Sequence, residues 1–251
     1  MTAPFAWPFD LGTGAVLWLA AAAFGAAFVR GYSGFGFGAI LIAAGALVTN
    51  PLRLVAVAML ADLAMSAQMW RAVRPQIDWR RAAILFAGAL AGLPLGLWAL
   101  TQVSEAAVRV VVALYVLAMG IILLRGWVLQ ARGGGVVLGT GIFSGAANAA
   151  GVGGLPVVVL LAAQGIPAAA FRATLVAYFA MLDIWTLGLF AAYGLIDRET
   201  WVAVAMLAPC LIAGTWAGSR RFLAAAPHEF RRFAVWILIG LACAGLVRAA
   251  L

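Results

Sequence analysis

The chain contains few of the side chains that soluble proteins and most enzymes rely on. It has no lysine and one histidine, and only 10% of its 251 residues are charged. Without lysine it has no Walker A loop, so it is not an ATPase on its own. Its two cysteines, Cys210 and Cys243, lie in apolar runs, which indicates small buried side chains rather than a disulfide or a metal site. We therefore expect no metal, no cofactor and no enzyme activity, because candidate ligands for an active centre are scattered.

Apolar residues fill most of the chain instead. They make up 67% of it, and the mean hydropathy is +1.11. A soluble domain of this size cannot bury so much apolar surface. A membrane span needs about 20 apolar residues, so we predict a single all-α, polytopic membrane domain over residues 1–251, embedded in the lipid bilayer. Its apolar segments lie at about 13–30, 35–49, 53–70, 81–100, 107–125, 136–150, 154–165, 169–193, 201–219 and 232–249.

The arginines predict which loops are cytoplasmic. All sixteen basic residues are arginine, and the net charge is +8. They cluster between apolar runs, which indicates membrane topology rather than nucleic-acid binding. Loops 71–81 and 220–232 are rich in arginine and are predicted inside, whereas 101–105 and 197–199 are poor inside loops. All four loops obey the rule only if 13–49 and 136–165 each enter the membrane and return as a hairpin.

The two halves of the chain, about 13–125 and 136–249, resemble each other. Each half then holds a glycine-rich hairpin followed by three long spans. With five segments per copy, an odd number, the copies would be inserted in opposite orientations, an arrangement typical of secondary transporters. The matched pairs include Gly38 with Gly154, Met65 with Met181, Gly92 with Gly214, and Gly96 with Gly218.

Two glycine-rich stretches, GYSGFGFG at 31–38 and GAANAAGVGGLP at 145–156, fall at equivalent places in the two halves. Broken backbone at membrane depth is tolerated where it is buried or faces a wet cavity. Its free amides and the N-termini of half-helices attract anions. Tight helix packing through small residues is the alternative, and we prefer it for Gly92/Gly96 and Gly214/Gly218. The substrate-binding candidates in the two turns are Ser33, Gly34, Gly36, Gly38, Ser144, Asn148, Gly151, Gly153 and Gly154.

Four further polar residues are candidates for the transport site. Arg172 opens the segment 169–193 and can pair with an anion as a planar fork, or it can simply reach the membrane interface. Thr174 can add a hydroxyl. Asp62 and Asp183 lie inside apolar runs, where ionisable groups are usually functional. They are candidates for proton coupling, with a place near the membrane interface or static pairing to Arg53 or Arg172 as the alternatives.

The sequence also resembles a known family at these residues. GYSGFGFGAI and NPLRLVAVAMLAD in the first half, and GVGGLPVVVLLAAQGIPAAAFRATLVAYF in the second, are similar to the sulfite exporter TauE/SafE family, also called the toluene-sulfonate uptake permease (TSUP) family. The resemblance implies a permease of the bacterial inner membrane that moves small anions, typically sulfur oxyanions or organosulfonates. The residues alone predict an inverted-repeat transporter with turns suited to anions, and the specificity for sulfur comes from the resemblance.

The leading functional hypothesis is therefore a secondary transporter of a small anion, with proton coupling as one option. An anion channel of the same architecture and a non-transporting membrane subunit are the alternatives. The sequence leaves open the identity of the anion, the direction of transport, the coupling ion and whether the chain forms a homo-oligomer.

Overall fold

The computed structural model describes residues 8–125 and 133–222, and all regular elements in these two ranges are helical. This confirms the predicted all-α class for the described part of the chain. The last predicted span, 232–249, lies outside the described residues, as do most of the loop 220–232 and residues 126–132. The elements are η1 (Pro8–Asp10), α1 (Thr13–Ser33), α2 (Phe37–Gly45), α3 (Arg53–Val73), η2 (Arg74–Gln76), α4 (Trp79–Thr101), α5 (Glu105–Arg125), α6 (Gly134–Asn148), α7 (Gly154–Ala163), α8 (Ala168–Ala192) and α9 (Arg198–Phe222).

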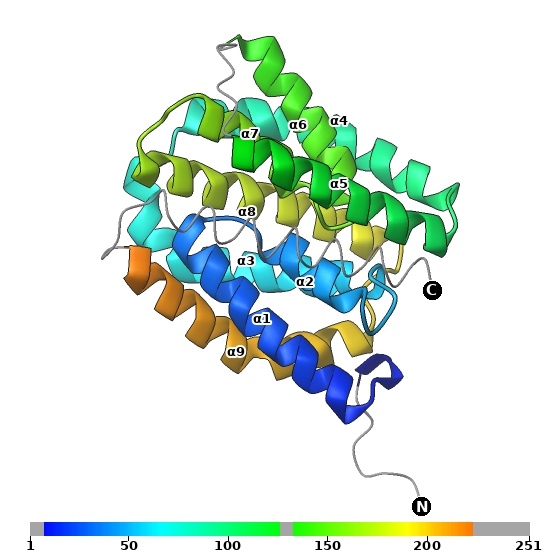
Figure 1. Cartoon of the computed structure of the whole chain (residues 1–251). Helices are drawn as coiled ribbons and strands as arrows, with labels where there is room; N and C mark the ends of the chain where they lie inside the picture. Colours follow the sequence, from blue (N-terminus) through cyan, green and yellow to red (C-terminus); the bar gives the residue numbers. More distant parts are fainter. Residues whose placement is uncertain (1–7, 126–132, 223–251) are drawn as a thin grey trace, which may run out of the picture.

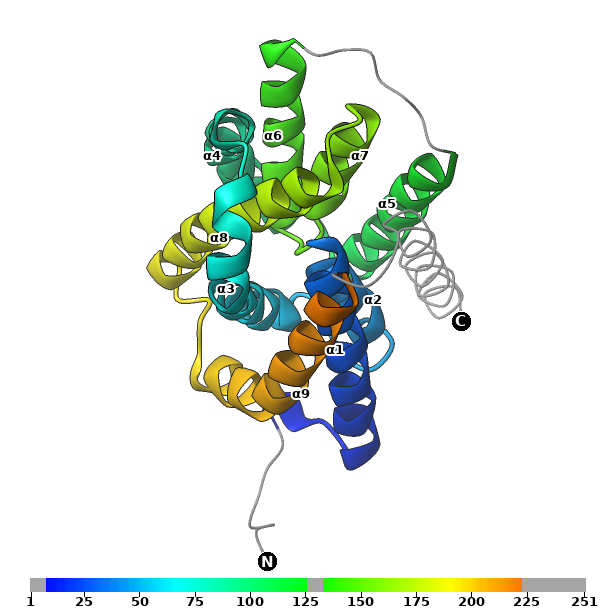
Figure 2. The same cartoon turned by 90° about the vertical axis from the view of Figure 1, so that its left-hand side faces the viewer.

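The helices form a bundle with α3 and α8 at its centre (Figures 1 and 2). On one side of this central pair lie α4 and α6, which pack against each other, and on the other side lie α1 and α9. Among the described residues, four helices, α1, α4, α8 and α9, are long and apolar enough to cross a membrane. Helix α3 is as long as α1 but carries more polar residues, and about half of its side chains are buried among its neighbours. The chain is therefore built as a membrane protein.

The first glycine-rich stretch breaks the chain into a hairpin. Helix α1 ends at Ser33, where Gly34 adopts a left-handed conformation with φ of 82°. Gly36, with φ of 94°, precedes α2, which turns back along α1. The indole Nε1 of Trp18 donates to the carbonyl of Ala44 at 3.0 Å, so the start of α1 and the end of α2 lie side by side. The prediction of one continuous segment over 35–49 was too long, because α2 stops at Gly45 and turns follow.

The second glycine-rich stretch forms a second hairpin from α6 and α7. Helix α6 ends at Asn148, and Gly151 reverses the chain with φ of 75°. Helix α7 begins at Gly154 and has ten residues, about 15 Å. Pro156 lies in its first turn, where a missing amide hydrogen costs nothing. Both short helices, α2 and α7, are thus only about half as long as a typical hydrocarbon core is thick.

Glycines allow the outer helix pairs to pack backbone against backbone. A Cβ added to Gly92 or Gly96 of α4 would collide with carbonyl groups of α6, at Ile142 and Ala146. The same holds for Gly214 and Gly218 of α9, which face the carbonyls of Phe24 and Phe28 on α1. These four glycines therefore have the packing role that the sequence suggested. Further contacts of this kind come from Gly31, Gly88, Gly141 and Gly145.

Hydrogen bonds connect loops to their neighbours at the two opposite ends of the bundle. At one end, the amide of Asp78 donates to the Thr174 hydroxyl at 3.0 Å, and Arg81 donates to the Gln164 side chain at 3.0 Å. Partial burial acts to raise the pKa of Asp78, but hydrogen bonds from Arg81 and its charge outweigh burial and hold that pKa below its usual value. At the other end, the Phe9 amide donates to the Glu199 carboxylate at 3.0 Å. The segments that the arginines assign to opposite sides of the membrane thus lie at opposite ends.

The glycine packing predicts a specific loss of stability. Gly92→Ala places a methyl group against the α6 backbone, and we expect a loss of about 1–3 kcal/mol. Gly139→Ala is the matched control, because Gly139 lies on α6 with open space around it, and alanine there should leave stability unchanged or slightly higher. Thermal unfolding of both variants in detergent measures the difference. Equal midpoints for the two variants would contradict the packing role.

Candidate functional site

The two hairpin turns meet at the centre of the bundle. A Cβ added to Gly38, in the first turn of α2, would lie 2.8 Å from the carbonyl oxygen of Gly151 in the second hairpin. A cavity of about 40 Å³ lies beside this contact, which is larger than the minimum that a water molecule needs. We call it the central cavity. Its lining comes from both turns and from α1, α3 and α8: Arg30, Phe35, Gly36, Phe37, Gly38, Ala39, Met59, Asp62, Asn148, Gly151, Val152, Gly154, Leu155, Phe179 and Asp183.

Two half-helices begin at the central cavity. Phe37, Gly38 and Ala39 form the first turn of α2 and all line it. The first amides of a helix have no acceptor within the helix, and no described residue accepts a hydrogen bond from these three. Gly154 and Leu155 place the first turn of α7 on the same cavity. Two positive helix ends therefore converge on one small space, an arrangement that favours an anion.

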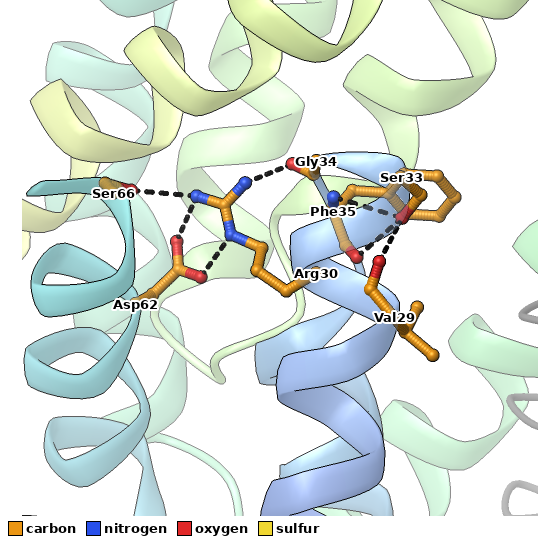
Figure 3. A network of polar contacts seen from close by, with 7 residues as sticks. All are labelled: Val29, Arg30, Ser33, Gly34, Phe35, Asp62 and Ser66. Atoms are coloured by element: carbon orange, nitrogen blue, oxygen red, sulfur yellow. Dashed lines mark hydrogen bonds and ion pairs between the residues drawn. The ribbon is translucent and has the colours of Figure 1, made fainter. Parts of the chain in front are cut away.

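A buried arginine carries the formal positive charge of this site. Arg30 is 1% exposed, and its Nε and Nη2 donate to the two carboxylate oxygens of Asp62 at 2.6 and 2.9 Å (Figure 3). Nη2 also reaches the Ser66 hydroxyl at 2.9 Å, and Nη1 donates to the carbonyl of Gly34. The guanidinium thus ties α3 to the glycine turn that precedes α2. One alternative from the sequence was a static ion pair between Asp62 and Arg53 or Arg172. In the structure, Asp62 pairs with Arg30 instead.

A second carboxylate lines the cavity without a cation of its own. Asp183 is 2% exposed, and its Oδ2 has no hydrogen-bond partner. It interacts electrostatically with both Asp62 and Arg30. The ring of Phe179, one turn earlier on α8, covers the Arg30 guanidinium at 5.1 Å. Within the described residues the cavity therefore holds one arginine and two acids.

Asn148 and Ser144 hold the second hairpin from different sides. The Asn148 amide lines the cavity and donates to the Thr186 hydroxyl at 2.9 Å and to the Met59 sulfur at 3.6 Å. Ser144 lies behind the turn, where its hydroxyl donates to the carbonyl of Gly153 and lies 2.7 Å from the Tyr178 hydroxyl. Gly153 has no room for a side chain, because a Cβ would meet Ser144 and Asn148. Ser144 and Gly153 thus shape the turn without facing the cavity.

The first hairpin is held in a similar way. The Ser33 hydroxyl lies 2.8 Å from the carbonyl of Val29 and 3.1 Å from that of Phe35, and it accepts from the Phe35 amide at 3.4 Å. Gly34 offers its carbonyl to Arg30, and a Cβ added to Gly34 would lie 3.0 Å from Arg172. Neither Ser33 nor Gly34 lines the central cavity.

Arg172 and Thr174 lie outside the central cavity. Arg172 donates from Nε and Nη2 to the carbonyl of Gly31 at 3.1 and 2.6 Å, and from Nη2 to the Ser219 hydroxyl at 2.9 Å. It lies on one wall of a second cavity, of about 240 Å³, which we call the inner vestibule because the arginines of loop 71–81 predict that this end of the bundle is cytoplasmic. Thr174 accepts the hydrogen bond from Asp78 at the same end. The inner vestibule is lined by Tyr32, Ser33, Phe35, Leu161, Ala162, Ile166, Ala168, Phe171, Arg172 and Phe222.

A third cavity, of about 680 Å³, lies at the end of the bundle that holds Phe9 and Glu199. Helix α8 places the three cavities in order. Arg172 lines the inner vestibule, Asp183 lines the central cavity, and Phe190 lines the third cavity, which we call the outer vestibule. The small central cavity therefore lies between two larger ones. Among the predicted residues it collects Gly36, Gly38, Asp62, Asn148, Gly151, Gly154 and Asp183.

Sequence reasoning missed Arg30, although its guanidinium donates hydrogen bonds to Asp62, Ser66 and Gly34. We placed the end of the first apolar segment at this residue, and so treated its charge as a boundary. The sequence did contain a signal for Arg30, which is its spacing from Gly34. The two residues are one helical turn apart, and a side chain can reach a free carbonyl at that distance. Tyr178 and Phe179 gave no such signal, since aromatic residues are common in any span.

The sequence model of the sulfite exporter TauE/SafE family matches residues 19–245. The chain belongs to this family. The match begins inside α1 and covers both hairpin turns and all later described helices, and it confirms the resemblance seen in the sequence. TauE/SafE proteins are membrane transporters rather than enzymes, so the central cavity is a candidate site for a transported anion. Comparisons with curated proteins and with solved structures gave no significant match. No cluster of three metal-ligating side chains occurs in the described ranges.

The Arg30–Asp62 pair predicts a non-additive mutant cycle. Arg30→Met leaves buried carboxylates without their cation and should cost about 3–5 kcal/mol of stability. Adding Asp62→Leu removes the unpaired charge, so the double variant should recover most of this loss. Unfolding midpoints in detergent measure the cycle. A double variant no more stable than Arg30→Met would show that the pair does not hold α1 to α3.

Proposed function

We propose that this TauE/SafE protein is a secondary transporter that carries a small sulfur oxyanion or organosulfonate across the bacterial inner membrane. The observation that carries the proposal is the convergence of two helix N-termini and the Arg30 guanidinium on one buried cavity. Oxyanions such as sulfite accept several hydrogen bonds at once, and main-chain amides with a guanidinium supply them. The sulfur specificity rests on the family, because backbone amides suit many oxyanions.

We further propose that the protein consists of two inverted repeats, about 13–125 and 136–249. The packing of the described helices supports this arrangement. The hairpin helix α1 packs on α9 through Gly214 and Gly218, and the hairpin helix α6 packs on α4 through Gly92 and Gly96. These glycines are the ones that match between the halves. The central pair α3 and α8 would then be equivalent helices on either side of a pseudo-two-fold axis in the membrane.

The hairpins also point in opposite directions, which supports the inversion. The end of α1, at Tyr32 and Ser33, lines the inner vestibule. The end of α6 is followed by Ala149, which lines the outer vestibule. The first hairpin therefore enters from the end of the bundle that holds the outer vestibule, and the second enters from the end that holds the inner vestibule. A small cavity between two vestibules favours alternating access over a continuous channel.

The charges of the cavity support proton coupling through Asp183. Arg30 and Asp62 neutralise each other, so an ionised Asp183 would make the cavity negative and repel an anion. Asp183 faces Arg30 from α1 and Asp62 from α3, with Tyr178 as the nearest titratable group on its own helix. From α6 and α7 the cavity receives only uncharged groups. A protonated Asp183 leaves the cavity neutral with two positive helix ends, so anion and proton would travel together.

Flux in proteoliposomes tests the proposed transport. The purified chain should take up radiolabelled sulfite with saturation and show counterflow. Arg30→Gln should lower the uptake about 10- to 100-fold, since one charged hydrogen-bonding group is lost. Arg71→Gln is the matched control, because Arg71 is exposed on α3 and touches none of the three cavities. Flux that does not saturate would favour a channel, and no flux would favour a non-transporting subunit.

Asp183→Asn separates transport from coupling. Asparagine resembles the protonated acid in size and lacks a titrating group, so the variant should keep sulfite exchange without a gradient. It should lose accumulation driven by a pH gradient, while the original chain accumulates sulfite on the side to which protons flow. Measuring sulfite exchange and gradient-driven uptake in the same proteoliposomes shows whether Asp183 is needed for proton coupling or for transport itself. Undiminished accumulation by Asp183→Asn would remove the proposed proton role.

A further inference from the structure

The central cavity and the inner vestibule have one lining residue in common, Phe35. The side chain is 1% exposed, so its ring fills the space between the two cavities. It meets Phe171 of α8 edge to face, with the ring centres 6.3 Å apart. An apolar ring offers an anion no hydrogen bond, and a constriction of this kind blocks ions by excluding water. As described, the ring therefore closes the central cavity on this side.

The backbone on both sides of Phe35 can turn at little cost. Gly34 and Gly36 both adopt positive φ, of 82° and 94°. Glycine passes between positive and negative φ more readily than other residues, and hinge positions absorb such changes when gates open. Phe35 is thus carried on a Gly-Phe-Gly segment with a hinge before and after it. The Ser33 hydroxyl holds the segment in its present position through the Phe35 backbone.

The vestibule behind the ring is suited to receive an anion. Arg172 is 7% exposed there, and no described acid forms an ion pair with it. The ring of Phe222 packs on the Arg172 guanidinium, with 4.6 Å between the guanidinium carbon and the ring centre. The vestibule also lies at the end of the bundle where Gln164 bonds to Arg81, in the arginine-rich loop 71–81. The guanidinium of Arg172 on one side of Phe35 and the amides of α2 on the other give an anion favourable positions on both sides.

We propose that Phe35 is the gate between the central cavity and the inner vestibule. With its ring on Phe171 the gate is closed, and rotation about Gly34 and Gly36 opens a path for a small anion between the α2 amides and Arg172. The inference rests on the proposed transport function for the identity of what passes. The position of the Phe35 ring between the two cavities does not depend on which anion passes, so the gate can be tested without a substrate.

Cysteine labelling tests the gate. The reporter is Met59→Cys, which lines the central cavity, in a chain whose Cys210 and Cys243 are replaced by alanine. A membrane-impermeant, anionic thiosulfonate reagent is applied to the face that carries loop 71–81. Phe35→Ala should speed labelling at least about tenfold, because the ring that separates the cavities is gone. Phe171→Leu should speed it less, since it removes only the ring that Phe35 rests on.

Phe37→Ala is the matched control. Phe37 has the same type and burial as Phe35 and lines the central cavity, but it does not line the inner vestibule. Its removal should leave the labelling rate within about twofold of the reporter alone. Equal acceleration of labelling by Phe35→Ala and Phe37→Ala would overturn the gate. So would the absence of any acceleration in both Phe35→Ala and Phe171→Leu. If labelling follows the prediction while sulfite flux is absent, the gate stands and the proposed function fails.

Discussion

The central part of the structure depends on one buried ion pair, Arg30 with Asp62. Two charges placed in a membrane bundle are stable only when they neutralise each other and their remaining hydrogen bonds are made. The second condition explains why Arg30 also reaches Ser66 and the carbonyl of Gly34. Through that carbonyl the pair holds the glycine turn, and through the turn it sets where α2 begins. The position of the first anion-attracting helix end is therefore a consequence of how one arginine is satisfied.

The second constraint is the close approach of helices at the periphery. Glycines bring α4 onto α6 and α9 onto α1 until backbones touch. Each contact fixes the long helix of a hairpin, and the short helix of that hairpin then begins inside the bundle. Because α2 and α7 are too short to cross a membrane, their N-termini meet at the centre, beside Gly38 and Gly151. Rigid outer pairs and short inner helices together explain how broken backbone is tolerated at membrane depth.

The sequence was sufficient for the features that depend on pattern. Apolar length predicted the helices, glycine clusters predicted both hairpins, and apolar context singled out Asp62 and Asp183, which the fold brings to one cavity. It was insufficient where a role depends on which neighbour a side chain meets. Arg172 and Thr174 bind backbone groups at one end of the bundle, and Ser144 supports a turn from behind. Arg30 was missed because a charge at the end of an apolar run has the same pattern whether it faces lipid headgroups or a buried acid.

The central claim is that two helix N-termini and Arg30 bind a permeating oxyanion. Selenite has nearly the shape and charge of sulfite, and selenium can be located by anomalous diffraction from crystals soaked at several concentrations. We expect a saturable selenium site in the central cavity, next to the amides of Phe37, Gly38 and Ala39 and the first turn of α7. Well-ordered crystals with an empty central cavity, or with selenium only on exposed arginines, would contradict it.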